Sequence, residues 1–535
     1  MPFEFKVPEK QSVSEPYFET GNYHMAVTTN SAEAQGWFNR GLIWTHTFNH
    51  EEACRCFMQC IAHDPECAMA YWGFAYAAGP NYNKTWAMFD PKDLSQTISK
   101  CHKVAHIALS KAGHVSLMEK ALIEAVQKRY PSKDIPDDFT QANKSYADEM
   151  RIVYNSYNDH LDIVALFADA LMNWKPRQIF DINTGKPIAS SPVFEVRGVL
   201  ERGLTMPGAR GHAGIPHLYI HLMERSDEPE VTLAACDIIR DLVPDVGHMF
   251  RMPTHIDVLV GEYRRSITYN YKATVADDRY FAKHGGLNFY SFYRLHDYHS
   301  LVYACMACDR MESAITREML TVKSPPMADW LEFSLAVRVH VYIRFGMWED
   351  ILALPIPGDK DLYCVTIVMT HYGKGIAYAS LNRLEAADAQ RELYHKAAKR
   401  VPDSRLDFPN RIVDVLKVAT AMLNGEIEYR RQNYQVAFES LREAIKAEDS
   451  LMCAEPWGRM LLSRHPYGAL SLEQRLTLTR AHQHPKNVWA LHGYHECLIC
   501  LGRNAETIII KSLLKLAQGE ADVPIGSSYC CRLGV

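Results

Sequence analysis

Histidines concentrate in one stretch of this 535-residue chain, where eight of them fall between His212 and His299. Two belong to the element His217-Leu-Tyr-Ile-His221, whose spacing places both imidazoles one turn apart on the same face of a helix. Neutral imidazole is a common ligand of zinc, copper, iron and nickel, and two histidines at this spacing can bind one ion without straining the helix. The stretch therefore predicts a metal site inside a helical protein.

Further candidate ligands follow the first pair along the chain. Glu224 comes three residues after His221, and it could either bind the ion or orient His221 through the second ring nitrogen. In Met252-Pro-Thr-His255 we expect the proline to interrupt a helix and to direct His255 inward from a rigid turn. These positions suggest that ligands converge from separate elements.

A second group of candidate residues lies near the end of the histidine-rich stretch. His296 and His299 are three residues apart on an expected helix, and we prefer His299 as the ligand. Tyr293 and His248 are the candidate catalytic residues, which would handle protons, although His248 fits a ligand or a substrate contact equally well. The complete set of predicted metal ligands is His217, His221, His255, His299, Glu224 and His296.

Three more histidines have an open role. His212 could be a ligand or a substrate contact. His46 and His50 share the spacing of a helical pair, but turn chemistry at the end of a helix also explains them, so their membership of the site stays open. Most other histidines are interpreted as hydrogen-bonded core residues, and His284, next to two glycines, as a turn residue.

The elements that must position these residues form a repeat. Between residues 37 and 65, large, small, aromatic and proline residues follow the tetratricopeptide pattern, in which small residues let two helices approach and the proline ends the second helix. A similar alternation from Met69 to Ala78, and turn formers before later helices, indicate further and more degenerate copies. The positions of the first copy are Trp37, Gly41, Trp44, Ala53, Phe57 and Pro65.

The predicted fold is all-α, with few or no strands. It is an α-solenoid of tetratricopeptide-like helix hairpins that form a right-handed superhelix around a central cavity. We expect an N-terminal extension over residues 1–30, a continuous solenoid over 31–515 with the histidine-rich repeats at about 200–300, and a C-terminal tail over 516–535. Pro, Gly, Asp and Ser accumulate at 131–138 and 173–192, which predicts irregular loops there.

Several short elements carry a resemblance to a known family. They are Phe48-Asn-His-Glu-Glu-Ala53, Tyr71-Trp-Gly73, Gly79-Pro-Asn81, Ala168-Asp-Ala-Leu-Met-Asn173, His217-Leu-Tyr-Ile-His221, Gly247-His248 and Met252-Pro-Thr-His255. This combination resembles a family of tetratricopeptide-repeat proteins of bacteria and fungi that carry HxxIH, GH, MPxH and HxxH elements together. The resemblance covers roughly residues 30–510 and departs from the usual repeat around 470–484. It implies the helical-repeat fold, and the shared histidines are unusual for a pure scaffold.

Composition and missing motifs exclude several function classes. The net charge of −5 gives no basic footprint for nucleic acid, and no apolar run is long enough for a membrane span. The N-terminal residues lack the plan of a secretory signal, so we expect a cytoplasmic protein. Among the fourteen cysteines, the pairs Cys305/Cys308 and Cys497/Cys500 and the single residues Cys54 and Cys60 are interpreted as core thiols, and Cys530-Cys531 as part of a flexible tail. Phosphate loops, dinucleotide fingerprints, nucleophile elbows and the His-Glu-x-x-His element are all missing from the sequence.

Three function hypotheses remain. The first is a metal-dependent oxidoreductase in which iron or copper oxidises a small, aromatic organic molecule with dioxygen, because tyrosines and phenylalanines surround the histidines in sequence. The second is a non-catalytic scaffold that binds a peptide or protein partner in its groove. The third is a zinc-dependent hydrolase or lyase that uses the same histidines. The sequence favours the first hypothesis, since a scaffold does not require histidines in the middle repeats.

Overall fold

The computed structural model describes residues 7–181, 184–305, 309–323, 326–452, 462–473, 487–521, 525–527 and 529. The regular secondary structure of the described residues is helical apart from one two-stranded hairpin, in which β1 (Leu406–Asp407) pairs antiparallel with β2 (Asn410–Arg411). The prediction of an all-α fold with few strands is confirmed. The tail residues Cys530 and Cys531 lie outside the described residues.

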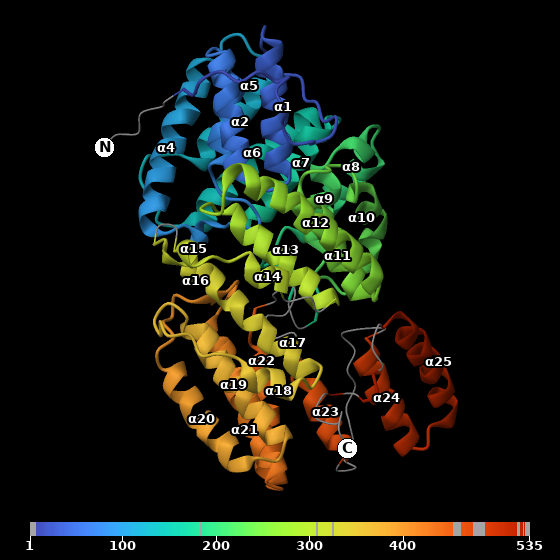
Figure 1. Cartoon of the computed structure of the whole chain (residues 1–535). Helices are drawn as coiled ribbons and strands as arrows, with labels where there is room; N and C mark the ends of the chain where they lie inside the picture. Colours follow the sequence, from blue (N-terminus) through green and yellow to red (C-terminus); the bar gives the residue numbers. More distant parts are fainter. Residues whose placement is uncertain are drawn as a thin grey trace. The chain divides into compact units, whose positions relative to one another are not determined.

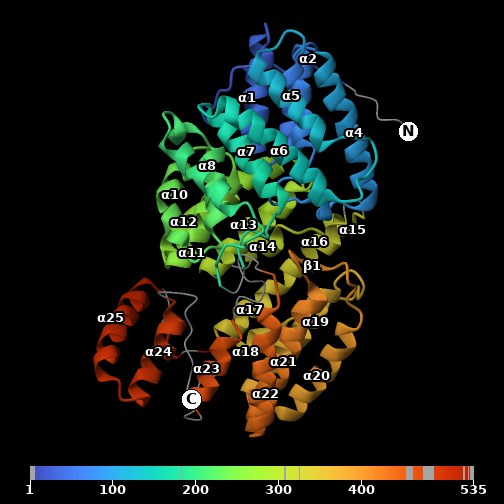
Figure 2. The same ribbon diagram turned by 180° about the vertical axis from the view of Figure 1, so that it is seen from behind.

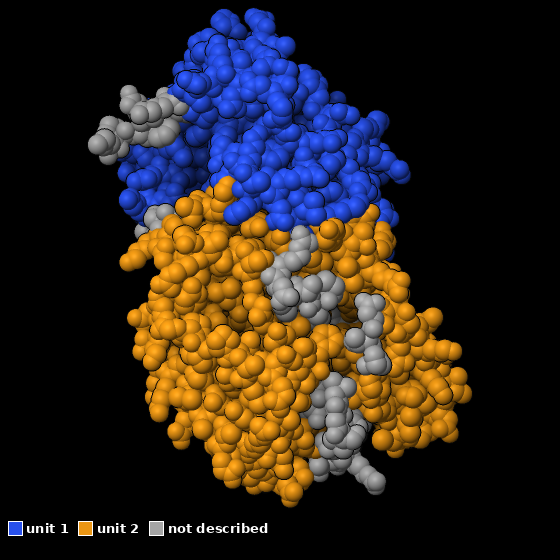
Figure 3. Space-filling model, in the orientation of Figure 1, with its two compact units in different colours: residues 1–256, 272–284 blue, residues 257–271, 285–535 orange. Residues whose placement is uncertain are grey.

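The chain divides into two compact units, which Figure 3 shows in different colours. The first unit comprises Met1–Ile256 and Lys272–His284, and the second comprises Asp257–Tyr271 and Gly285–Val535. Two helices, α11 and α12, contribute residues to both units. The continuous superhelix over 31–515 and its central cavity stay predictions.

Helices α1 to α12 form most of the first unit (Figures 1 and 2). Their bounds are α1 (Ala32–His46), α2 (His50–His63), α3 (Ala68–Ala77), α4 (Pro91–Ser110), α5 (Leu117–Arg129), α6 (Phe139–Tyr157), α7 (Leu161–Trp174), α8 (Val193–Thr205), α9 (Gly214–Met223), α10 (Leu233–Ile239), α11 (Gly247–Val260) and α12 (Tyr263–His284). Short 3-10 turns lie at η1 (Trp86–Met88), η2 (Ala209–Gly211) and η3 (Pro229–Thr232).

Helices α13 to α25 and one further 3-10 turn belong to the second unit. Their bounds are α13 (Tyr290–Cys305), α14 (Asp309–Ser313), α15 (Arg317–Thr321), α16 (Met327–Leu331), η4 (Glu332–Ala336), α17 (Val337–Arg344), α18 (Trp348–Ala353), α19 (Cys364–Ser380), α20 (Leu384–Ala398), α21 (Ile412–Arg430), α22 (Tyr434–Asp449), α23 (Arg464–Glu473), α24 (Val488–Cys500) and α25 (Asn504–Glu520).

Consecutive helices pack as hairpins, the arrangement of tetratricopeptide-type repeats. The pairs α1–α2, α3–α4, α6–α7, α19–α20 and α21–α22 show it most extensively. The predicted loop at 131–138 lies between the end of α5 at Arg129 and the start of α6 at Phe139. Most of the predicted loop at 173–192 lies between the end of α7 at Trp174 and the start of α8 at Val193. None of the described helices is long and apolar enough to span a membrane.

The first hairpin shows how the small residues of the repeat act. A Cβ atom on Gly41 of α1 would lie 2.7 Å from the ring of Phe57 on α2, and one on Gly73 of α3 would lie 2.4 Å from the same ring. The two glycines therefore enclose Phe57, which is fully buried. The predicted role of the small residues in bringing helices together is confirmed for this copy.

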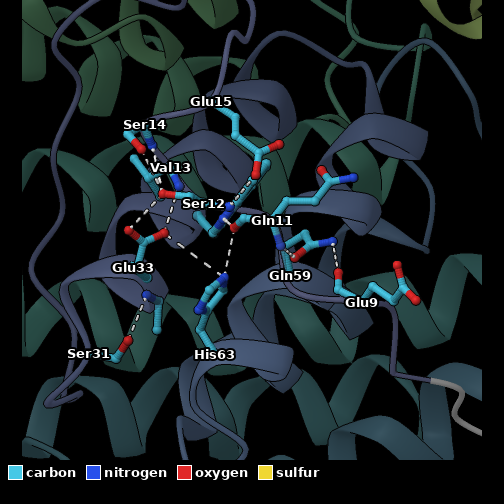
Figure 4. Close-up of polar contacts among 12 residues, drawn as sticks. Glu9, Gln11, Ser12, Val13, Ser14, Glu15, Ser31, Glu33, Gln59 and His63 are labelled. Atoms are coloured by element: carbon cyan, nitrogen blue, oxygen red, sulfur yellow. Dashed lines mark hydrogen bonds and ion pairs between the residues drawn. The ribbon is translucent and has the colours of Figure 1, made fainter.

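The N-terminal extension lies along α1 and α2, and Figure 4 shows its polar contacts. Gln59 of α2 contacts the extension twice, since its amide nitrogen donates to Glu9 O at 2.8 Å and its oxygen accepts from Gln11 N at 2.9 Å. Glu33 of α1 accepts from the backbone N–H of Val13 at 2.6 Å. The extension is thus part of the first unit.

The enclosed ring of Phe57 makes the hairpin sensitive to one added methyl group. Gly41→Ala should lower the free energy of unfolding of the first unit by about 1–3 kcal/mol, because the new Cβ forces Phe57 from its rotamer. Gly113→Ala is the matched control, since its Cβ would meet no heavy atom within 4 Å. Urea unfolding followed by circular dichroism measures both variants, and an equal shift in the two would contradict this account of the packing.

Candidate metal centre

Two helices of the first unit supply the histidines of the centre. His217 and His221 lie one turn apart on α9, and both are buried. His248, Arg251 and His255 lie three and four residues apart on α11, so they share one face of that helix. The predicted helical spacing of the first pair is therefore present, and α11 adds a histidine-rich face beside it.

Three imidazoles meet at the centre. Ligand nitrogens of His217, His221 and His248 all lie within 4.8 Å of one another. His217 Nε2 is 3.0 Å from His248 Nε2. Two nitrogens that bind one tetrahedral ion at 2.0–2.1 Å are about 3.3–3.4 Å apart. The observed separation is close to this value, so a small shift would accommodate an ion.

The hydrogen bonds of the first pair leave one nitrogen of each ring available. His217 Nδ1 donates to the backbone oxygen of His46 at 2.7 Å, which leaves the Nε2 lone pair free of a proton. His221 Nδ1 donates to Glu224 Oε1 at 3.2 Å. Its buried Nε2 has no hydrogen-bond partner among the described residues. Carbonyl and carboxylate partners of this kind orient metal-binding histidines in proteins.

Glu224 is the orienting group of this site. Besides the contact with His221, it accepts from His255 Nδ1 at 2.7 Å. The guanidinium of Arg251 donates to His255 Nε2, so both nitrogens of His255 are engaged. In this arrangement Glu224 and His255 support the ligands. Their own place in the ligand set stays a prediction.

His248 makes the most informative contact. Arg251 Nη2 lies 2.7 Å from His248 Nδ1, and because a guanidinium only donates, Nδ1 accepts and the ring proton is on Nε2. That proton then points to His217 Nε2. A metal ion at this position has to displace the proton, either to solvent or to Nδ1 after the guanidinium moves. His221 Nε2 can bind an ion as it stands, whereas His217 and His248 bind one only after this proton is displaced.

Burial keeps the three imidazoles neutral, which is the form that binds metals. Burial lowers the pKa of His217 and of His248 well below the ordinary value, with the charges of neighbouring groups as smaller causes. The pKa of His221 is also lowered by burial, although Glu224 opposes the shift. Burial raises the pKa of Glu224, but the imidazoles that donate to it outweigh burial and hold its pKa well below the usual range.

Phe48 covers the three rings from the turn between α1 and α2. Its ring centroid lies 4.6 Å from that of His217, and it stacks on the rings of His221 and His248. The backbone of Phe48 has a φ of 64°, a conformation that costs energy for an aromatic residue. The turn therefore holds an apolar wall over the imidazoles at some cost in strain.

A second group of possible ligands lies next to the first, and most of its polar atoms are hydrogen-bonded, whereas His212 Nε2 has no hydrogen-bond partner among the described residues. His212 Nδ1 accepts from the N–H groups of Gly214 and Ile215 at the start of α9, and its Nε2 is 3.4 Å from Asp162 Oδ1. Asp162 also accepts from Tyr23. Together with His46, this group forms a buried hydrogen-bonded cluster. We therefore interpret His212 as a helix cap.

A partly open hollow of about 270 Å³, space open to solvent included, adjoins this cluster in the first unit, and Phe48 forms part of its wall. Asp169 and His50 supply polar atoms to the same wall. Burial raises the pKa of Asp169, which accepts a hydrogen bond from Tyr76 at 2.5 Å. Burial, together with the charge of Arg129, lowers the pKa of His50 to about 3. His50 therefore faces this pocket as a neutral group.

The remaining predicted site residues belong to the second unit. Tyr293, His296 and His299 all lie on α13, and His296 and His299 line a different pocket. Burial lowers the pKa of His299 to about 4. The structure thus gathers His217, His221, Glu224, His248 and His255 in one place within the first unit, and the part of the α13 residues in the site stays a prediction.

Sequence reasoning missed two features of the centre. Pro253 does not interrupt α11, which continues through it, so the prediction that His255 projects from a rigid turn is wrong. The loss of one backbone hydrogen bond is local, and Thr254 Oγ1 donates to Arg251 O at 2.7 Å beside it. Phe48 was also missed as a wall, although a large aromatic residue in a turn where glycine is usual is a visible signal.

Comparison with known proteins adds little to the geometry. No protein-family model matches the chain, and no curated protein matches its sequence. A solved structure described as "Crystal structure of APC/C hetero-tetramer Cut9-Hcn1" is similar at 12% identity and a TM-score of 0.30, over 94% of this chain and 78% of that one. Another, "Structure of Naa15/Naa10 bound to HypK-THB", is similar at 12% identity and a TM-score of 0.21, over 91% and 71%. Neither likeness bears on function at these scores.

Loss of the α9 pair should remove metal from the protein. His217→Ala with His221→Ala should abolish stoichiometric metal, because two of three ligand nitrogens disappear. His102→Ala with His106→Ala is the control, since this pair has the same spacing on α4 but His106 is exposed and neither residue belongs to a group of possible metal ligands in the described part of the chain. Elemental analysis of protein purified without a tag gives the readout, and full metal content in the α9 variant would reject the site.

The orienting role of Glu224 predicts a graded effect. Glu224→Gln should weaken metal binding by about 10–100-fold without abolishing it, because His221 loses a charged acceptor but keeps its position. Glu230→Gln, on an exposed residue six positions later, should bind metal as the wild type does. Competition with a chromophoric chelator measures both affinities. Complete loss in Glu224→Gln would instead make Glu224 a ligand.

Proposed function

We propose that the first unit binds one transition-metal ion through His217, His221 and His248 and oxidises a small organic molecule with dioxygen. The observation that supports this most is the buried Nε2 of His221, which has no hydrogen-bond partner in the described chain and lies beside two further imidazoles. A nitrogen lone pair without a partner costs free energy in a protein interior. Binding of a metal ion removes that cost.

The donor set is consistent with copper, iron or zinc. Three neutral imidazoles without a directly bound carboxylate leave one or more positions open on any of these ions. Bound iron or copper would supply redox chemistry with dioxygen, whereas bound zinc would supply an activated water. We favour iron or copper because the surroundings are aromatic and because a protease-type His-Glu-x-x-His element is missing from the sequence.

The protein side of the reaction depends on the pocket beside Phe48. Its wall combines aromatic and aliphatic surface with Asp169 and Tyr76, which share a hydrogen bond of 2.5 Å. A flat substrate with a hydroxyl or amino group fits such a wall, since Asp169 could accept its proton while the rings bind its apolar face. Phe48 belongs both to the wall of this pocket and to the cover of the three imidazoles. Tyr76 would position the carboxylate.

The competing hypotheses predict different outcomes from the same protein. A zinc-dependent hydrolase or lyase would use the same histidines but would be active with zinc and without oxygen. A scaffold for a peptide or protein partner would bind its partner equally well after the metal is removed. Both alternatives are decided by the metal that the protein retains and by its reaction with oxygen.

Oxygen consumption tests the proposal directly. Metal-free protein reloaded with copper or iron should consume oxygen in the presence of simple phenols or aromatic amines, and His221→Ala should consume none. Asp169→Asn should retain the metal but lose most of the turnover, because the proton acceptor is lost. Retention of zinc alone, with no oxygen consumption by the iron or copper form, would contradict the proposal.

A further inference from the structure

A second pocket lies entirely within the second unit, between α13, α16, η4 and β1. It is a partly open hollow of about 330 Å³, space open to solvent included, and four of its ten lining residues are Phe or Trp. Phe292 and Phe408 meet edge to face with ring centroids 5.9 Å apart, and Trp330 and Phe333 supply the remaining aromatic surface. This pocket is separate from the residues that form the candidate metal centre.

Two hydrogen-bond acceptors face this aromatic wall. Asp407 on β1 is only 6% exposed, and among the described residues no hydrogen bond or ion pair reaches its carboxyl group. His299 on α13 is 2% exposed, and its Nε2 has no hydrogen-bond partner in the described part of the chain. Polar groups buried to this degree are nearly always hydrogen-bonded in folded proteins. Because both groups lie in a pocket wall, we expect a ligand to form the hydrogen bonds that they lack.

The nearby guanidinium of Arg405 contacts other acids than Asp407. Arg405 lies two residues before Asp407, but its guanidinium lies 3.5 Å from Asp329 and 3.9 Å from Glu332. It also donates to the backbone oxygen of Asp361 at 3.0 Å. These contacts engage Arg405 with other groups, and among the described residues no ion pair reaches Asp407.

We propose that this pocket binds a small organic cation, namely a primary ammonium group on a flat aromatic body. The ammonium would donate to Asp407 and to His299, and the rings of Phe292, Trp330, Phe333 and Phe408 would surround it. Aromatic faces attract cations, and the attraction is strongest where water is excluded. A carboxylate within an aromatic wall therefore selects a cation over a neutral molecule of the same shape.

The pKa of Asp407 suits the binding of a cation. Burial raises the pKa of Asp407 to about 7, so its charged form is disfavoured in the empty pocket. A raised carboxyl pKa lowers the stability of the folded protein as the pH rises toward that value. Asp407→Asn keeps the shape and removes the charge, so the variant should fold and should be at least as stable as the wild type at mildly alkaline pH.

Calorimetric titration of the full chain with benzylamine and benzyl alcohol tests the proposal. The two probes have almost the same shape, and only the amine is charged near neutral pH. Wild type should bind benzylamine about ten-fold or more tightly than benzyl alcohol, and Asp407→Asn should remove most of that preference. Asp403→Asn is the matched control, since this acid is exposed and four residues away.

A second variant separates loss of charge from loss of fold. Phe333→Leu should weaken the binding of both probes while its melting temperature confirms a folded protein. Equal affinity of the wild type for amine and alcohol, unchanged benzylamine binding by Asp407→Asn, or no saturable benzylamine binding would each overturn the proposal. Removal of metal from the protein should leave these affinities unchanged, so the outcome is independent of the proposed oxidation.

Discussion

The buried carboxylate of Glu224 is the interaction on which the candidate metal centre depends. A carboxylate in a protein interior is stable only when it is paired or hydrogen-bonded, and Glu224 accepts from His221 at 3.2 Å and from His255 at 2.7 Å. His221 lies near the end of α9, just before Glu224, and His255 lies on α11. The side chain of Glu224 therefore joins the two helices. Arg251, which donates to His255, supplies the compensating charge. His221 is thereby held with its other nitrogen toward His217 and His248.

The repeat architecture explains why such a network can form. Each hairpin buries one face of two helices. The end of α1 and the turn before α2 place the carbonyl of His46 and the ring of Phe48 in contact with His217 of α9. Glycines at the helix contacts allow this close approach, as Gly41 and Gly73 do around Phe57. Elements far apart in the sequence, near residues 48, 220 and 250, therefore meet in one buried place.

The sequence predicts some parts of this arrangement and not others. The spacing of His217 and His221 is a local property, so the shared helix face and the partnership with Glu224 follow from it. The role of His255 does not follow from local spacing, because the contacts of its ring depend on Arg251 and on the continuation of α11 through Pro253. His299 has the same residue type and a similar local pattern, yet it lies on α13 in the other unit. Residue type and spacing cannot show which helices meet, since that depends on packing across hundreds of residues.

The most direct test of the central claim is X-ray absorption spectroscopy of protein purified without a tag and loaded with one equivalent of copper or iron. The proposed site predicts nitrogen ligands at about 2.0–2.1 Å with the outer scattering of at least two imidazole rings. The double variant of His217→Ala and His221→Ala should lose this signal. A sulfur ligand, a shell of oxygen without imidazole, or an unchanged spectrum in the double variant would contradict the site.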